Sequence, residues 1–319
     1  MRVGAEPRGS YMNNQKLIVI TGPTAAGKTS LGALVAKMAN GEVVSADSMQ
    51  IYKHMDIGTA KPAEDEKLGI AHHMLDIVPP WEDYSVARYV SDASRCIDDI
   101  IRRGKLPVLV GGTGMYIDSL TSGREFSARG DPKLRLELEE EYETHGGGAM
   151  LQKLHGFDPE SAAKLHENDK KRIVRALEVY ETTGKTISEH DMETKLLPPR
   201  YDAVKFALTF TERAELYAQI DIRVDAMLAK GLEEEARGLL DMGVPPGCTA
   251  MQAIGYKELS GVISGDCDMT AAVEKIKRES RRYAKRQLTW LRRDKNVNWI
   301  FRDKEPDVES AAQFIMHNS

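Results

Sequence analysis

Eight consecutive residues near the N-terminus form a phosphate-binding pattern with the spacing G-x-x-x-x-G-K-[ST]. They are Gly22, Pro23, Thr24, Ala25, Ala26, Gly27, Lys28 and Thr29. An aliphatic run precedes them and apolar residues at helical spacing follow, as a buried strand and an amphipathic helix would give. Backbone N–H groups and the helix dipole favour an anion at such a loop. The pattern predicts a P-loop that binds a polyphosphate through Lys28, with the Thr29 hydroxyl placed to hold magnesium.

Two more polar residues follow predicted strands. Asp47 comes after the apolar run 43–46, and Thr113 lies between glycines in the run 111–114, which follows another strand. Ligands of doubly wound sheets bind beyond the carboxyl ends of the strands, where both residues would lie beside the P-loop. Asp47 is a candidate base, the alternative being a turn or helix-capping carboxylate. Thr113 either contacts a ligand or belongs to a tight turn.

Composition predicts a soluble globular protein with one large or two moderate domains. The 319 residues are 41% hydrophobic and 29% charged, and no apolar run reaches the ~18 residues of a membrane span. The three scattered cysteines predict a reducing compartment, the cytoplasm, and neither they nor the pair His72 and His73 have the spacing of a metal site. Residues 1–15 are expected to form a flexible tail, with Met12 as an alternative start.

Positive charge is concentrated in one segment of an otherwise acidic chain. The formal net charge is −5, yet residues 275–293 contain nine basic residues and a single acid, Glu279. Tyr283 and Trp290 are interleaved with the cations, a combination typical of phosphate neutralisation with base stacking. A solvated helix face is the alternative, but such faces usually mix both signs of charge. This segment therefore favours a nucleic-acid partner.

Strands and helices alternate through most of the chain, which predicts an α/β fold, a P-loop NTPase-like doubly wound parallel sheet. The stretch 131–200 shows helical periodicity without a convincing strand, and predicts a helical insertion domain between the core segments 16–130 and 201–319. The expected strands are 16–20, 42–46, 72–77, 106–111, 205–210 and 297–300. The expected helices include 28–39, 85–103, 212–230, 232–242, 271–293 and, within the insertion, one that ends at Thr183 before Gly184.

The chain resembles the tRNA dimethylallyltransferases, or isopentenyl-pyrophosphate:tRNA transferases, from about residue 16 to 300. The resemblance is carried by nine segments in order: GPTAAGKT (22–29), SADSMQIY (45–52), IGTAKP (57–62), HHMLDI (72–77), VGGTGMY (110–116), DPKLR (131–135), NDKKRIVRALE (168–178), MQAIGYKE (251–258) and KRQLTWLRR (285–293). It implies transfer of a dimethylallyl group from dimethylallyl diphosphate to N6 of the adenosine 3′ of the anticodon in tRNA. The expected partners are tRNA and dimethylallyl diphosphate, with Mg²⁺ as cofactor and a monomer as the oligomeric state.

The resemblance also implies roles for individual residues. The P-loop and Arg223 would bind the diphosphate, Asp47 would accept the N6 proton, and Thr113 would hydrogen-bond near the reacting centre. The insertion would bind the anticodon stem-loop. The residues expected to contact tRNA, besides Asp47 and Thr113, are Ser48, Met49, Gln50, Arg135, Lys171, Arg172, Ile173, Val174, Arg175, Gln252, Ala253, Ile254, Gly255, Tyr256, Lys257, Lys285, Arg286, Gln287, Leu288, Thr289, Trp290, Leu291 and Arg292.

Two features of the sequence depart from common patterns. Lys171 stands where many family members have glutamine, and the Cys/His set of the eukaryotic zinc finger is missing, which predicts a bacterial type. The apolar run ending in Asp that P-loop ATPases use for magnesium is poor here, with only Asp76 as a candidate. A small-molecule kinase, a prenyltransferase of free adenine nucleotides and a non-catalytic RNA-binding protein remain alternatives.

Overall fold

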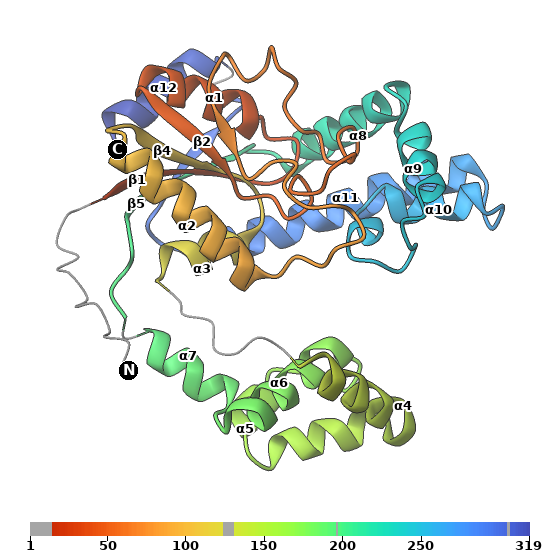
Figure 1. Ribbon diagram of the computed structural model, residues 1–319. Helices are drawn as coiled ribbons and strands as arrows, with labels where there is room; N and C mark the ends of the chain where they lie inside the picture. The colour runs from red at the N-terminus through yellow and green to blue at the C-terminus, as the bar shows by residue number, and fades with distance from the viewer. Residues whose placement is uncertain (1–14, 124–130, 196, 305–306) are drawn as a thin grey trace, which may run out of the picture. The chain divides into compact units, whose positions relative to one another are not determined.

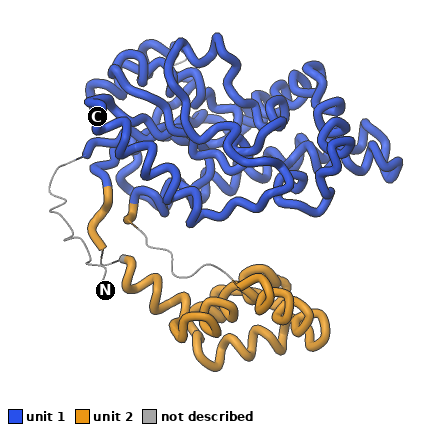
Figure 2. Tube along the Cα trace, viewed as in Figure 1, with its two compact units in different colours: residues 1–121, 201–319 blue, residues 122–200 orange. Residues whose placement is uncertain are grey.

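The structure, a computed structural model, describes residues 15–123, 131–195, 197–304 and 307–319. The predicted tail and the alternative start at Met12 lie outside these residues, except for Gln15. The chain divides into two compact units, residues 1–121 with 201–319, and residues 122–200 (Figure 2). No helix in the described ranges is long and apolar enough to cross a bilayer.

A six-stranded parallel sheet forms the centre of the first unit, in the order β3-β2-β4-β1-β5-β6 (Figure 1). Each neighbouring pair is parallel, so the loops that follow the strands meet at one edge of the sheet. The predicted parallel α/β sheet is thus confirmed. The strands are β1 (Lys16–Thr21), β2 (Gly41–Ser45), β3 (His72–His73), β4 (Leu106–Val110), β5 (Asp202–Thr209) and β6 (Val297–Phe301).

Helices cover both faces of this sheet. On one face, α1 (Lys28–Met38) and α12 (Val308–His317) bury residues such as Leu31 and Ile315 against the strands. On the other, α2 (Val86–Arg102) and α3 (Gly114–Thr121) pack through a cluster that extends to the helices following β5. These later elements are α8 (Arg213–Ala229), α9 (Leu232–Asp241), the 3₁₀ turn η1 (Ala250–Gln252), α10 (Tyr256–Ile263) and α11 (Met269–Leu291).

The second unit is helical and has its own core. It contains α4 (Pro132–His155), α5 (Pro159–Ala162), α6 (Lys170–Thr183) and α7 (Ile187–Lys195). A kink interrupts α4 at the glycine run 146–148, where Gly146 has a φ of 80°. The predicted end of α6 before Gly184 is confirmed, and Gly184 is left-handed, with a φ of 69°. The predicted boundary at residue 131 adjoins residues 124–130, which lie outside the described part of the chain.

The largest difference from the predicted elements is the strand expected at 72–77. Only His72 and His73 pair with β2, because Met74 and Asp76 have left-handed φ values of 63° and 54°, which no strand accommodates. The helices α3, α10 and α12 were not among the predicted elements. The segment between β2 and β3 is a long loop, and it forms part of the wall of the cavity described below.

A buried carboxylate anchors the start of β2, at the end of the strand opposite Asp47. The Glu42 side chain is 4% exposed and accepts hydrogen bonds from Arg103 Nη2, Lys105 Nζ and His73 Nε2, each at 2.7 Å. The hydrogen bonds from Arg103 in particular hold the pKa of Glu42 far below its ordinary value. The carboxylate therefore ties β2 to β3 and to the segment between α2 and β4.

Glu42→Ala is expected to lower the free energy of unfolding at pH 7 by about 2 kcal/mol, because three hydrogen-bond donors, which include the Arg103 and Lys105 cations, lose a shared acceptor while remaining partly hydrated. Since the folded pKa is depressed, this stabilisation is full above the ordinary carboxyl pKa and fades as the pH falls toward the lowered value. Urea unfolding at pH 7 and pH 3 should show the difference shrinking in acid. Asp99→Ala, which removes a more exposed partner that Arg103 shares with Arg102, should cost much less. Equal losses in the two variants would contradict this role.

Candidate active site

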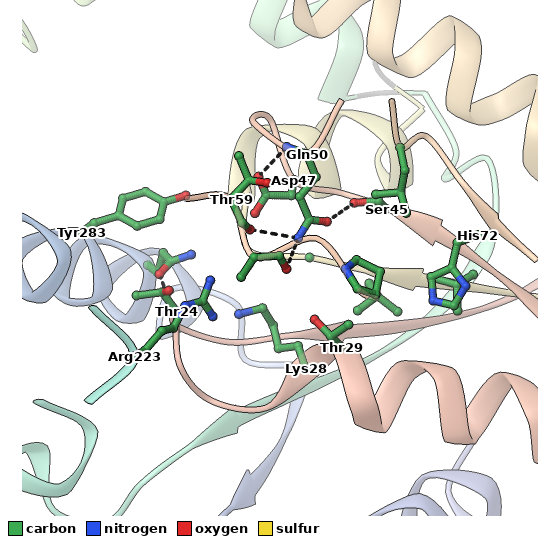
Figure 3. Close-up of a pocket in the computed structure, with 17 residues that line it drawn as sticks. Thr24, Lys28, Thr29, Ser45, Asp47, Gln50, Thr59, His72, Arg223 and Tyr283 are labelled. Carbon is green, nitrogen blue, oxygen red and sulfur yellow. Dashed lines mark hydrogen bonds between the residues drawn. The ribbon is translucent and has the colours of Figure 1, made fainter. Parts of the chain in front are cut away.

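The loops that follow β1, β2 and β4 line one cavity at the carboxyl edge of the sheet (Figure 3). The P-loop contributes Thr24, Lys28 and Thr29, and Asp47 follows β2. The loop after β4 is joined to the segment after β2, because Thr113 N donates to Ala46 O at 3.1 Å. The predicted convergence of these three loops is therefore confirmed. The other lining residues are Val43, Ser45, Gln50, Thr59, Ala60, Pro62, His72, Leu75, Val110, Gly111, Arg223, Tyr283 and Gln287.

The P-loop has backbone angles that suit an anion cradle. Gly22 has a φ of 140°, and a Cβ there would lie 2.4 Å from Leu208 O. Ala25 is left-handed, with a φ of 63°, and Gly27 precedes α1 at 82°. No side chain caps α1, so the N–H groups of its first turn face the loop without a capping partner. These amides and the helix dipole make the loop an anion-binding surface.

Two cations share this cavity with one carboxylate. Lys28 Nζ donates to Pro23 O at 2.7 Å, and Figure 3 shows Lys28 and Arg223 side by side. Burial and, to a lesser extent, the nearby Arg223 charge lower the pKa of Lys28 to about 7, while the Asp47 charge opposes the shift. Burial also lowers the pKa of Arg223, again against the effect of Asp47. The cavity is thus built so that an additional anion would relieve the repulsion between its cations.

Asp47 has the turn role that its sequence position suggested, and it also lines the cavity, while its role as a base stays a prediction. Its Oδ1 accepts from Met49 N at 2.9 Å and from Gln50 N at 3.4 Å, which fixes the side chain. Its Oδ2 accepts no hydrogen bond from any residue that the structure describes. Asp47 lines both the P-loop cavity and a second, adjoining cavity. It is therefore a held carboxylate with one oxygen available to a ligand.

Thr113 and Tyr283 lie beside Asp47. Thr113 Oγ1 accepts from Ser48 N at 3.0 Å and is 3.3 Å from Ser48 Oγ. The Tyr283 hydroxyl points toward Asp47 and Thr59 (Figure 3). Burial and the Asp47 charge raise the pKa of Tyr283 to about 12, so the phenol stays protonated and can donate. The sequence predicted Tyr283 only as a stacking residue among the cations of 275–293. Its position beside Asp47 had no local signal in the sequence.

The loop 56–62 forms a wall of the cavity and is held by buried polar contacts. Gln50 Nε2 donates to Thr59 O and Ala60 O at 3.2 and 3.1 Å, while its Oε1 accepts from Ser45 Oγ. On the outer side, the Glu235 carboxylate accepts from the backbone N–H groups of residues 56, 57 and 58 and from Tyr256. Gln50, which was predicted to contact RNA, holds this loop to the end of β2. The role of Glu235 was not identified from the sequence.

The second cavity opens from the first toward α8, α10 and α11. The two share Thr24, Asp47, Thr59, Arg223 and Tyr283. Apolar groups from Met49, Ala253, Ile254 and Met227 line much of the second cavity, and Arg286 lies at its wall. Of the residues predicted to contact tRNA, Ser48, Met49, Gln252, Ala253, Ile254, Gly255 and Arg286 are thus brought together with Asp47.

Acidic side chains neutralise more of the positive charge of helix α11 than the sequence suggested. Arg281 Nη1 binds Asp221 at 2.6 Å, Lys277 binds Asp225 at 2.7 Å, and Arg282 binds Glu279 at 2.7 Å. Part of the charge excess seen in the sequence is therefore neutralised within the protein, because α8 supplies acids that the segment itself lacks. Among the described residues, Lys285, Arg286, Arg292 and Arg293 form no ion pair and remain exposed.

Several residues predicted to contact tRNA are buried. Ile173 and Val174 are 0% and 2% exposed and belong to the core of the second unit. Tyr256, Gln287, Leu288 and Leu291 are likewise buried within the first unit. Packing inside the protein covers these six side chains, and their contact with RNA stays a prediction. Lys171, Arg172, Lys257 and Thr289 are exposed, while Trp290 Nε1 donates to Asp118 at 2.6 Å.

Within the second unit, two predicted RNA contacts share a buried acid. Arg135 Nη2 lies 3.0 Å from both carboxylate oxygens of Glu178, and Arg175 Nη1 lies 2.7 Å from Oε2. Glu178 is fully buried, so the two arginines compensate its charge. Each guanidinium remains partly exposed, at 48% and 40%.

The residues present suit magnesium shared with a ligand better than an all-protein metal site. The described ranges contain no cluster of three or more His, Cys, Asp or Glu side chains that could hold a metal. Thr29 lines the cavity beside Lys28, and Asp76 is bound to Lys61 instead. Mg²⁺ commonly keeps several waters and takes one or two protein oxygens together with phosphate oxygens. A threonine hydroxyl beside an anion cradle fits that mode.

Comparison with known proteins identifies the family. The sequence model described as IPP transferase matches residues 50–294, and the one described as isopentenyl transferase matches residues 15–77. The tRNA dimethylallyltransferase of Acetivibrio thermocellus is 49% identical over 289 residues, which are 90% of this chain and 92% of that protein. That of Caldanaerobacter subterraneus is 49% identical over 302 residues, 94% and 96% of the two chains.

Solved structures agree with these sequence relatives. The tRNA isopentenylpyrophosphate transferase of Bacillus halodurans is 41% identical, with a TM-score of 0.69 over 95% of this chain and 96% of that one. A eukaryotic dimethylallyltransferase solved acting on tRNA is 33% identical, with a TM-score of 0.75 over 87% and 70% of the two chains. Since both the family model and these relatives cover most of its length, this chain belongs to the tRNA dimethylallyltransferase family.

Proposed function

We propose that this protein transfers a dimethylallyl group from dimethylallyl diphosphate to N6 of the adenosine 3′ of the anticodon in tRNA, in the cytoplasm. The observation that carries the proposal is the arrangement of Lys28, Arg223 and Asp47 in one cavity that continues into a second, more apolar one. A diphosphate suits the cations of the first cavity. A base and a prenyl chain suit the adjoining space, whose walls include Met49 and Ile254.

In the proposed reaction the bond between the prenyl C1 and the diphosphate oxygen breaks, and a bond from C1 to N6 forms. Negative charge collects on the departing diphosphate, where Lys28, Arg223 and the P-loop amides stabilise it. Magnesium bound through Thr29 would neutralise part of the same charge. The free Oδ2 of Asp47 receives the N6 proton, and its fixed Oδ1 keeps the carboxylate oriented.

The adenine must leave the anticodon stack to reach Asp47, at a cost of a few kcal/mol. Tyr283 lines the junction of the two cavities and offers its hydroxyl to the incoming base, while Thr113 holds the neighbouring Ser48. The exposed cations at the end of α11 and on α6 are suited to contact RNA phosphates. A single protein chain is expected to be sufficient for these contacts.

A small-molecule kinase is the alternative that the P-loop alone would allow. Asp76, the carboxylate that such a reading needs for magnesium, forms an ion pair with Lys61. The strand β4 ends in Gly111 and Gly112 rather than in an acid. Nucleoside mass spectrometry of tRNA incubated with the protein, Mg²⁺ and dimethylallyl diphosphate distinguishes the two. Prenylated adenosine supports the proposal, whereas unmodified tRNA with ATP-dependent phosphoryl transfer would favour the kinase.

Asp47→Ala is expected to lower kcat by a factor of about 10² to 10⁴, the usual contribution of a positioned general base. Affinity for tRNA should change little, because the carboxylate neutralises no phosphate. Incorporation of a labelled dimethylallyl group and RNA binding are measured on the same preparation. Full activity in Asp47→Ala would remove the carboxylate from the mechanism and favour a different acceptor.

Binding of inorganic diphosphate is expected to weaken as the pH rises above 7. The pKa of Lys28 is about 7 in the free protein, so the ammonium is charged below that pH and must take up a proton above it before it can bind an anion. The dissociation constant should then rise by up to about tenfold per pH unit. Lys28→Arg keeps a permanent charge and controls for titration of the ligand itself. If diphosphate binding by the wild type and by Lys28→Arg depended on pH in the same way, the lowered pKa of Lys28 would be contradicted.

Replacing Lys285 and Arg292 together with Met is expected to weaken tRNA binding and to reduce the slope of log K against log salt by about two, one per lost phosphate contact. The control Lys37→Met removes an exposed cation at the end of α1. Fluorescence anisotropy with an anticodon stem-loop at several salt concentrations measures both. A slope unchanged from the wild type would place the RNA elsewhere on the protein.

A further inference from the structure

The buried amide of Gln287 joins two of the loops that form the active site. Its Oε1 accepts from Thr24 N in the P-loop at 2.9 Å, and its Nε2 donates to Gly112 O at 2.9 Å. The residue lies on α11 and is 6% exposed. One side chain from a helix far along the chain therefore connects the loop after β1 with the loop after β4.

Only a side chain with both an acceptor and a donor satisfies these two groups. Thr24 presents an N–H and Gly112 presents a carbonyl oxygen, so the orientation of the amide is fixed by its partners. An apolar side chain of similar size would leave both backbone groups without a partner. Buried polar groups without a partner are costly, so the loops would be expected to shift rather than leave them unpaired.

The loop after β4 is shaped to admit this amide. A Cβ on Gly112 would lie 2.3 Å from Gln287 Nε2, so any larger residue there would displace the side chain. The same helix is docked one turn later, where the Trp290 ring covers Gly114 and its Nε1 binds Asp118 at 2.6 Å. The helix is thus held close at the point where Gln287 contacts the two loops.

The contact determines which P-loop amides are left for a ligand. The Thr24 N–H is used by Gln287, whereas the amides at the start of α1 are not capped by any side chain. Thr24 itself lines both cavities, together with Asp47 and Arg223. Gln287 therefore holds the first half of the loop, while α1 holds the second half.

We propose that Gln287 is a positioning residue that sets the shape of the diphosphate cradle, in place of the RNA contact predicted from its sequence position. This inference rests on the proposed function, because diphosphate is taken as the ligand of the P-loop. Although the residue borders the P-loop cavity, its amide is occupied by two backbone partners. It acts through Thr24 and Gly112, and its loss affects the diphosphate side of the reaction and spares the RNA side.

The experiment uses Gln287→Ala, Gly112→Ala and the double variant in the full-length protein. Gly112→Ala displaces the amide without removing it. In the double variant the new methyl group occupies space that the shortened side chain has vacated. Glu274→Ala, an exposed position on the same helix, is the matched control. Calorimetry gives the dissociation constant of inorganic diphosphate with Mg²⁺, and steady-state assays give KM for dimethylallyl diphosphate and for tRNA separately.

Each single variant is expected to bind diphosphate about tenfold more weakly than the wild type and to raise KM for dimethylallyl diphosphate similarly. KM for tRNA should stay within about twofold. The double variant should be no weaker than Gln287→Ala alone, because both changes act on one contact. If Gln287→Ala does not fold, Gly112→Ala still tests the inference by itself.

Unchanged diphosphate binding in Gly112→Ala and Gln287→Ala would overturn the inference, as would equal losses for diphosphate and tRNA, which indicate general destabilisation. These results differ from a failure of the proposed function. In that case the wild type itself would not bind diphosphate, and the comparison between variants would have no reference.

Discussion

The central constraint in this protein is a pair of positive charges held in a cavity with a single carboxylate. Burial and the charge of Arg223 lower the pKa of Lys28 to about 7, while the Asp47 carboxylate opposes the shift at both cations and Glu66 opposes it at Arg223. Keeping two cations this close in a partly desolvated site is unfavourable unless an anion joins them. The P-loop amides and the α1 dipole add to the positive potential. The affinity for a diphosphate and the stabilisation of a departing one therefore have the same physical origin.

This charge arrangement depends on polar side chains that belong to distant parts of the chain. Gln287 on α11 holds the P-loop to the loop after β4, and Gln50 ties the loop 56–62 to the end of β2. Glu235 on α9 binds the outer side of that same loop through three backbone N–H groups. The walls of the cavity are thus fixed by amides and a carboxylate, and its floor by the parallel strands. Asp47 is held in place by the turn that it forms itself.

Most of the fold and the centre of the site could be predicted from the sequence, because each depends on local patterns. The P-loop, Asp47 and the loop at 111–114 all follow aliphatic strands, and parallel strands must bring their carboxyl ends together. The polar side chains that hold these loops together could not be predicted in the same way. Gln287 and Tyr283 lie in what reads as a buried stripe, and nothing local indicates that their polar atoms meet Thr24 or point toward Asp47. The charge of α11 was misjudged for a similar reason, since Asp221 and Asp225 come from another helix.

The pKa of Lys28 tests the central claim most directly. It can be measured by nuclear magnetic resonance of isotopically labelled lysine, with Lys28→Arg to assign the signal, in the free protein and after addition of diphosphate. The account predicts a value near 7 in the free protein that rises clearly when diphosphate binds. A free-state value close to that of an ordinary lysine, or one that diphosphate leaves unchanged, would contradict it.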